Sequence, residues 1–177
     1  MFNKFRGARI SVVRPVNAYG PRQSIAAPYG PSKVRKIIPS FVCRALLGED
    51  IEIYGDGTQV SDCVHVWDVA HVFVTAMDAL LRGDDPVTDI EVGPTASVTV
   101  NEIAELVKVF ADSDSKIVHL PMRPGEVANA VVSADTTSLH RDLSIDPHRF
   151  IKLDNGIHET VDWYKKNWLP GYLEQNS

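Results

Sequence analysis

Cysteine is scarce in this sequence of 177 residues: only Cys43 and Cys63 occur, and neither belongs to a CxxC or CxxH pattern. Zinc sites and disulfide frameworks show such spacings, so the sequence predicts neither. The six histidines also lack the HExxH or paired spacing of metal ligands, and no metal site is assigned. We expect two reduced, half-buried thiols.

A basic excess and a long apolar run are missing as well. The 18 Lys and Arg against 23 Asp and Glu give a net charge of -5, which argues against a dedicated nucleic-acid surface. No apolar run approaches the roughly 18 residues of a membrane span, and the opening MFNKFRGARIS lacks the apolar stretch of a signal peptide. The sequence therefore predicts a cytoplasmic protein without membrane or nucleic-acid partners.

The sequence also lacks the glycines of a dinucleotide site. A Rossmann fingerprint needs three glycines between a strand and a helix, for the tight turn, the approach to the pyrophosphate and the helix packing. The single GxG here is Gly55 and Gly57, with Val at position 60, and no Walker A loop is present. This segment is therefore interpreted as a turn.

Short β-branched runs alternate with longer amphipathic segments. Strands are expected at 8–14, where Pro15 stops the run, and at 51–54, 63–67, 89–93 and 116–121. Helices are expected at 39–48, from Asp68, from Thr99, and from Asp154 or Asn155. This alternation predicts an α/β or α+β fold of short strands and packed helices, in a single domain over residues 1–177.

Two helix starts carry specific signals. Thr99 and Glu102 have the spacing of a capping box, and Pro39 suits a first helical turn, where its missing N–H would be unbonded anyway. Asp68 is placed to cap the helix that follows it. Apolar residues in that helix recur at i, i+3, i+4 and i+7, so all of them should face the core: Val69, Val72, Phe73, Ala76, Met77 and Leu80.

Four segments occur in the order and spacing of a known enzyme family: RPVNAYGPRQ (14–23), IEIYGDGTQVSDCVHVWDVA (51–70), VGPTASVTVNEIAELV (92–107) and RPGEV (123–127). The chain thereby resembles the carboxy-terminal part of the extended short-chain dehydrogenase/reductases, the NAD-dependent nucleotide-sugar epimerases and dehydratases. The resemblance implies the substrate-binding part of that fold, without a complete Rossmann fold or the amino-terminal NAD-binding half. It implies NAD for a complete family enzyme, but no cofactor for this chain alone.

Tyr29 and Lys33 imitate the family's catalytic Tyr-x-x-x-Lys pair. That chemistry needs both side chains on one helical face, where the ammonium can lower the pKa of the phenol. Pro31 lies between them and disfavours a regular helix. The pair also follows RPVNAYGPRQ, whereas the family pair precedes that segment. We therefore expect a loop, and assign no catalytic residue.

The resemblance also implies substrate-binding residues. Asn17 matches a family asparagine that contacts the sugar nucleotide near its phosphates; the alternative is a turn residue bonded to its own backbone. Arg123 matches an arginine that grips the diphosphate or ribose, and a guanidinium suits phosphate oxygens, although a solvated arginine is the common alternative. Glu126 would accept from the ribose. Tyr54 would contact the nucleobase, whereas Ile53 is expected to be strand core.

One position departs from the family pattern. Gln59, Val60, Ser61 and Asp62 put a serine where the family has a phosphate-binding arginine. A hydroxyl gives one neutral hydrogen bond in place of a charged fork, so Ser61 should bind a diphosphate more weakly. Lys33, Arg35 and Lys36, just before the helix of Pro39, could compensate at that helix N-terminus, or could form a solvated basic loop.

The sequence thus predicts the nucleotide-sugar binding portion of an NAD-dependent epimerase or dehydratase, inactive without a separate NAD-binding half. One alternative is a noncatalytic nucleotide-sugar binding or assembly module that has lost the enzyme half. Another is a truncated product of a longer enzyme. The expected partners are a nucleoside-diphosphate sugar and either further copies of the chain or a chain that carries the NAD-binding half. Nucleobase, sugar and the choice among epimerase, dehydratase and decarboxylase stay open.

Overall fold

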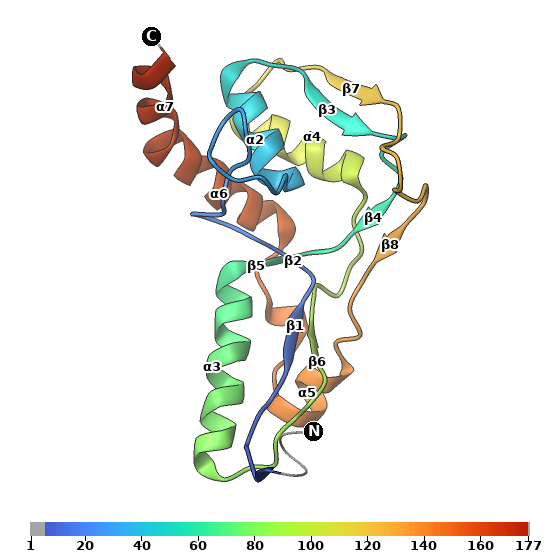
Figure 1. Ribbon diagram of the computed structural model, residues 1–177, viewed down its shortest axis with the longest axis vertical. Coiled ribbons are helices and arrows are strands. Elements are labelled where there is room, and N and C mark those ends of the chain that lie inside the picture. The colour runs from blue at the N-terminus through green and yellow to red at the C-terminus, as the bar shows by residue number, and fades with distance from the viewer. Residues whose placement is uncertain (1–5, 177) are drawn as a thin grey trace.

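The computed structural model describes residues 6–176 as a mixture of short strands and packed helices (Figure 1). The strands are β1 (Val13–Pro15), β2 (Asn17–Tyr19), β3 (Ile51–Tyr54), β4 (Val60–Ser61), β5 (Cys63–His65), β6 (Ile90–Val92), β7 (Ile117–Leu120) and β8 (Val131–Val132). The helices are α2 (Ile37–Leu47), α3 (Val66–Arg82), α4 (Val100–Ala111), α5 (Thr137–Leu143), α6 (Leu153–Asn167) and α7 (Leu169–Asn176), with a 3₁₀ turn at Pro147–Arg149.

The strands pair two by two, and every pair within residues 6–176 is parallel: β1 with β6, β2 with β5, β3 with β7, and β4 with β8. Parallel pairs need crossover connections, which the helices supply. The predicted α/β fold of short strands and packed helices is confirmed. None of the helices in the described range is long and apolar enough to cross a membrane.

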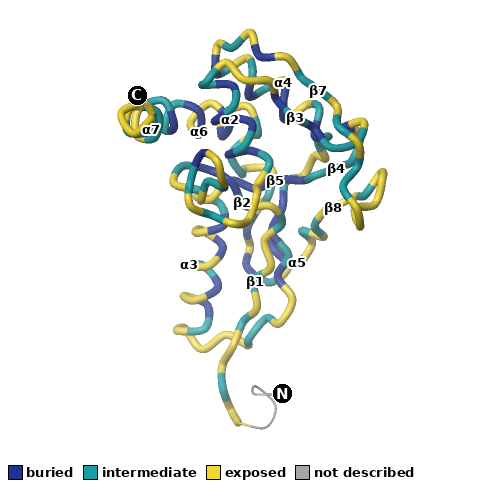
Figure 2. Tube along the Cα trace, turned by 45° about the horizontal axis from the view of Figure 1, so that its top comes forward, coloured by how far each residue is buried: buried dark blue, intermediate teal, exposed yellow. Residues whose placement is uncertain are grey.

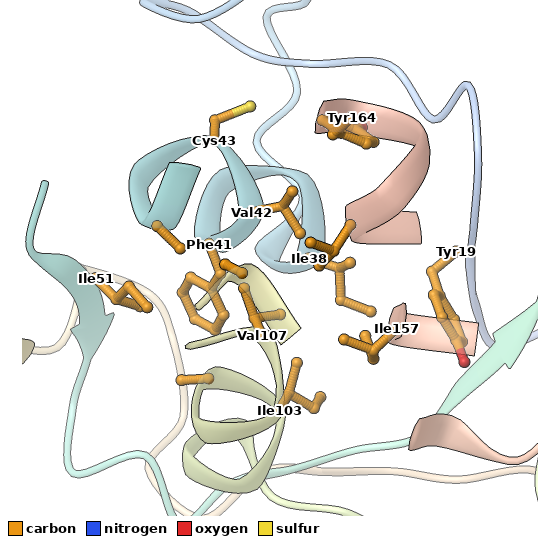
Figure 3. Close-up of a cluster of buried hydrophobic side chains, with 14 of the residues drawn as sticks. Tyr19, Ile38, Phe41, Val42, Cys43, Ile51, Ile103, Val107, Ile157 and Tyr164 are labelled. Atoms are coloured by element: carbon orange, nitrogen blue, oxygen red, sulfur yellow. The ribbon is translucent and has the colours of Figure 1, made fainter. Parts of the chain in front are cut away.

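Two hydrophobic cores hold these elements together. The larger core lies between α2, α4 and α6, where side chains from the three helices point toward one another (Figure 3). Phe41, Val107 and Ile157, one from each helix, are all buried. Full burial of such a side chain stabilises the fold by about 1.5–3 kcal/mol. The second core packs α3 and α5 around the β1–β6 pair (Figure 2).

Several local predictions are confirmed. The capping box of Thr99 and Glu102 begins α4, and Pro39 lies in the first turn of α2. Ile53 is buried strand core. Cys43 and Cys63 are free thiols, but both are fully rather than half buried, because they lie inside the larger core.

Two predictions about α3 were wrong. The helix begins at Val66, so the strand expected at 63–67 ends at His65, whose ring accepts from the Trp67 N–H at the N-cap. Asp68 therefore lies in the first turn instead of capping the helix. Its carboxylate accepts instead from the Ile151 N–H over 3.0 Å, a partner distant in sequence.

The predicted core face of α3 was also partly wrong. Val69, Val72 and Ala76 are buried, but Phe73 is 49% exposed and Met77 is 53% exposed. Only part of the apolar surface of α3 meets the β1–β6 pair and α5. The outward part has no covering element among the described residues.

The other boundaries shift. The strand expected at 8–14 forms at 13–15 and includes Pro15, which a strand tolerates at an edge, where no N–H is required. The last long helix begins at Leu153, and α7 follows it although the sequence did not predict it. The segment 122–147 contains β8 and α5, and most of its other residues form loops.

Candidate functional site

Three neighbouring cavities share lining residues, and together they are called the groove below. The first, of about 240 Å³, lies between the start of α2, the end of β3 and the loop after β7. Five of the predicted site residues line it: Arg35, Tyr54, Ser61, Arg123 and Glu126. The second lies at the carboxyl ends of β1 and β6, and the third joins the other two beside Asn17 and Lys36.

Arg123 and Tyr54 form the wall of the first cavity. The Arg123 guanidinium carbon lies 4.1 Å from the centre of the Tyr54 ring, within the range of a cation–π contact. Arg123 Nη1 also lies 3.5 Å from the Glu126 carboxylate, while its buried Nε has no hydrogen-bond partner in the described structure. The Arg123 side chain is 40% exposed, so its outer guanidinium N–H groups are available to an anion that enters the cavity.

Neighbouring side chains fix Tyr54. Arg35 donates to the Tyr54 hydroxyl over 3.3 Å, and Gln59 Nε2 donates to the Tyr54 carbonyl over 3.0 Å. The sequence displays Gln59 only as part of a motif and carries no signal for this hydrogen bond. The tyrosine thus presents its ring between two arginines, at the end of a strand anchored in the core.

Asn17 and Ser61 form the junction between the cavities. Asn17 Nδ2 donates to Ser61 Oγ over 3.2 Å and to the Asp62 carbonyl over 2.9 Å. The alternative of a turn residue bonded to its own backbone is wrong, because Asn17 lies in β2 and bonds across to the segment that enters β5. Since Ser61 Oγ accepts here, its hydroxyl proton is free to donate to a ligand.

The three predicted cations lie in different surroundings. Lys36 is the N-cap residue of α2 and lines the second and third cavities, whereas Arg35 lines the first and third. Lys33 is exposed and lines none of the three. The lining of the three cavities holds four cations, Arg14, Arg35, Lys36 and Arg123, and three carboxylates, Glu52, Glu91 and Glu126. The slight cationic excess suits an anionic ligand.

Tyr29 and Lys33 do not form an acid–base pair. Both lie in an irregular loop, as predicted from Pro31. Tyr29 is buried and its hydroxyl donates to Glu49 over 2.5 Å; burial and this hydrogen bond raise the pKa of the phenol. A catalytic tyrosine needs the opposite shift, so this pair does not supply proton transfer.

The chain is similar to proteins of one enzyme family. The family model described as "NAD dependent epimerase/dehydratase family" matches residues 2–93. A UDP-N-acetyl-alpha-D-glucosaminuronate decarboxylase of Bacillus cytotoxicus is 29% identical over 167 residues, which cover 91% of this chain and 48% of that protein. A dTDP-4-dehydro-6-deoxy-D-allose reductase of Streptomyces bikiniensis is 30% identical and is covered over 44% of its length.

Solved structures share the fold. The crystal structure of a UDP-glucose 4-epimerase of Thermotoga maritima with UDP-glucose superposes with a TM-score of 0.78 at 33% identity, over 93% of this chain and 48% of that chain. The chain spans about half the length of the curated relatives it matches, and that half is the carboxy-terminal one.

Proposed function

Because the chain belongs to the NAD dependent epimerase/dehydratase family, we propose that it is the part of a nucleotide-sugar enzyme that holds the substrate's nucleoside diphosphate. The observation that carries this proposal is the first cavity, where an aromatic ring lies between two guanidinium groups. An aromatic face suits a nucleobase, and guanidinium groups suit phosphate oxygens. We propose one substrate-binding domain over residues 1–177.

Each side chain receives a role in this proposal. Tyr54 contacts the nucleobase, and Glu126 accepts from the ribose hydroxyls. Arg123 leaves the Tyr54 ring and binds the diphosphate, and Ser61 donates one neutral hydrogen bond beside it. Asn17 orients Ser61.

The remaining basic residues and the second cavity complete the proposed binding mode. Lys36 and Arg35 supply further positive charge next to the phosphates, while Lys33 is too far from the lining to add more than a long-range contribution. The sugar would extend into the second cavity, at the carboxyl ends of β1 and β6, where α/β proteins commonly bind ligands.

The turn at Gly55 and Gly57 does not fit a dinucleotide pyrophosphate. Gly55 and Gly57 form the turn between β3 and β4, and a Cβ at Gly57 would lie 1.9 Å from Asn101 Oδ1. This glycine therefore accommodates the start of α4 instead of a pyrophosphate. No redox step is assigned to the chain, and the proposed enzyme activity requires an NAD-binding half.

Calorimetric titration of the chain with UDP and with uridine, at low ionic strength, tests the binding role. We expect UDP to bind at least about tenfold more tightly than uridine, because the diphosphate meets the arginines and uridine does not. Equal affinity for both ligands would contradict the phosphate role. Absence of binding to either ligand would favour the alternative of an assembly module, which the serine at position 61 also suggests.

A further inference from the structure

We propose that a fourth cavity, beside the groove, binds a free α-amino acid with an aromatic side chain. This cavity holds about 560 Å³ and lies where the loop after β2, the start of α3 and one face of α6 meet (Figure 1). Its volume falls within the roughly 300–1,000 Å³ of small-molecule sites. It adjoins the third cavity along β2, but none of the charged residues of the groove lines it. The proposal therefore does not rest on the nucleotide-binding role of the groove.

Two tryptophans from different helices line the fourth cavity. Trp67 lies in the first turn of α3 and is 60% exposed, and Trp163 lies on α6. Val66 and Ala70 of α3 add apolar surface to the same lining. Indole rings bind another planar ring by offset stacking or by edge-to-face contact. The lining therefore favours a ligand that carries an aromatic group.

Glu159 supplies the carboxylate of the fourth cavity. It lies four residues before Trp163, so both side chains are on one face of α6. Its Oε1 accepts from the Trp67 indole N–H over 3.2 Å, which joins α6 to α3 beside the cavity. A carboxylate has about four acceptor positions, so Glu159 retains acceptors for an ammonium group. The faces of the neighbouring indoles attract the same cation.

A buried histidine lies behind Glu159. His65 is 1% exposed, and its Nδ1 accepts from the Trp67 backbone N–H, which leaves the proton of the neutral ring on Nε2. Nε2 has no hydrogen-bond partner among residues 6–176, lies 3.7 Å from Glu159 Oε2, and would be 3.2 Å from a Cβ on Gly20, which also lines the cavity. A buried N–H without an acceptor is costly. This wall of the cavity is thus short of one acceptor, which points to a ligand that brings its own.

Arg22 supplies the cation of the fourth cavity. Its side chain is exposed and makes no hydrogen bond or ion pair with any other described residue. A free guanidinium binds a carboxylate through two parallel N–H groups. The lining thus offers one cation, one carboxylate and two indole rings. They match the carboxylate, the ammonium group and the ring of a zwitterionic aromatic amino acid, whereas a ligand of one charge would leave Arg22 or Glu159 without a partner.

Calorimetric titration of the full chain with three related ligands tests the proposal. The ligands are L-phenylalanine, phenethylamine, which lacks the carboxylate, and hydrocinnamate, which lacks the ammonium group. We expect L-phenylalanine to bind at least about tenfold more tightly than either analogue, because each analogue loses one charge-assisted contact. Absence of L-phenylalanine binding, or an analogue that binds as tightly, would overturn the proposal.

Two charge variants assign the contacts. Glu159→Gln keeps an acceptor for the Trp67 indole, and it should abolish the preference for L-phenylalanine over hydrocinnamate while the preference over phenethylamine remains. Arg22→Gln should have the converse effect, because it removes the partner of the ligand carboxylate. Variants that leave both preferences unchanged would overturn the assignment of the site to this cavity.

A third variant tests the aromatic wall. Trp67→Ala should weaken L-phenylalanine binding about tenfold or more, since the ligand ring loses an aromatic contact. Phe73→Ala is the matched control, because Phe73 is an aromatic residue of the same helix, is 49% exposed and lines none of the four cavities. It should bind as the wild type does, and circular dichroism should show all variants folded. Equal affinity in the Trp67→Ala and Phe73→Ala chains would overturn the proposal.

Discussion

The Asn17 amide donates to the Ser61 hydroxyl oxygen over 3.2 Å and to the Asp62 carbonyl over 2.9 Å, which joins β2 to the segment between β4 and β5. Both donors of the amide are thereby engaged. In the proposed site, Asn17 consequently acts on a ligand through Ser61, whose hydroxyl proton it leaves available. The junction of the groove therefore offers a single neutral donor at a position where the family pattern has an arginine.

Ser61→Arg should tighten UDP binding. A guanidinium at this point adds a charge-assisted contact, which contributes about 1.5–3 kcal/mol and corresponds to roughly a ten- to hundredfold gain in affinity. Calorimetric titration at low ionic strength measures this gain. Ser24→Arg adds the same charge outside the three cavities and should change affinity little. An equal gain in both variants would show a general charge effect in place of a contact at Ser61.

Gly156→Ala should destabilise the fold. A Cβ on Gly156 of α6 would lie 2.1 Å from the Tyr19 hydroxyl, and Tyr19 belongs to the same short strand as Asn17. Overpacking of this kind costs about 1–3 kcal/mol in the free energy of unfolding. Gly171→Ala in α7 is the control, because nothing lies within 4 Å of its Cβ position. That change should be neutral or stabilise by up to about 1 kcal/mol. Urea unfolding that gives equal shifts for the two variants would refute the close packing of Gly156 and Tyr19.

The buried thiols should make stability fall at alkaline pH. Burial raises the pKa of Cys43 and of Cys63 from 9.0 to about 12. A raised pKa in the folded state contributes stability below the unfolded value, and this contribution is lost as the pH rises from about 9 toward 12. We expect a loss on the order of 1 kcal/mol per thiol per pH unit in that range, measured by urea unfolding at several pH values.

Thiol labelling at pH 8 supplies an independent check of the same burial. Cys43 and Cys63 should react slowly in the folded chain and fully in denaturant. A cysteine introduced by Val109→Cys, at a position that is 68% exposed, should react at once. Rapid labelling of the two native thiols in the folded chain would contradict their burial.

Interactions between residues that lie close together in the sequence could be predicted from it. Thr99 and Glu102 are three residues apart, and their capping box forms as predicted. Asp68 shows the limit of such signals, because its partner is the Ile151 N–H, brought near only by the tertiary fold. The apolar pattern of α3 identified a helix correctly, but it could not separate residues covered within this chain from those left outward, such as Phe73 and Met77.

The site shows the same limit. Family motifs named Tyr54, Ser61 and Arg123, and the fold brings all three to one cavity. The contact of Arg123 with the Tyr54 ring joins residues that lie far apart in the sequence, which therefore gives no signal for it. The hydrogen bond from Gln59 to the Tyr54 carbonyl is local, but it belongs to no turn or capping motif that the sequence displays. Lys33 was named with Arg35 and Lys36 because the three are neighbours in sequence, yet it lies outside the groove.

Titration of UDP into the Arg123→Ala and Lys33→Ala chains tests the central claim most directly. If Arg123 binds the diphosphate, Arg123→Ala should weaken UDP binding roughly ten- to hundredfold at low ionic strength, whereas Lys33→Ala should change it less than about threefold. Calorimetry measures both affinities under one set of conditions. Equal affinities for the wild type and both variants would contradict the claim that this groove holds a nucleoside diphosphate through Arg123.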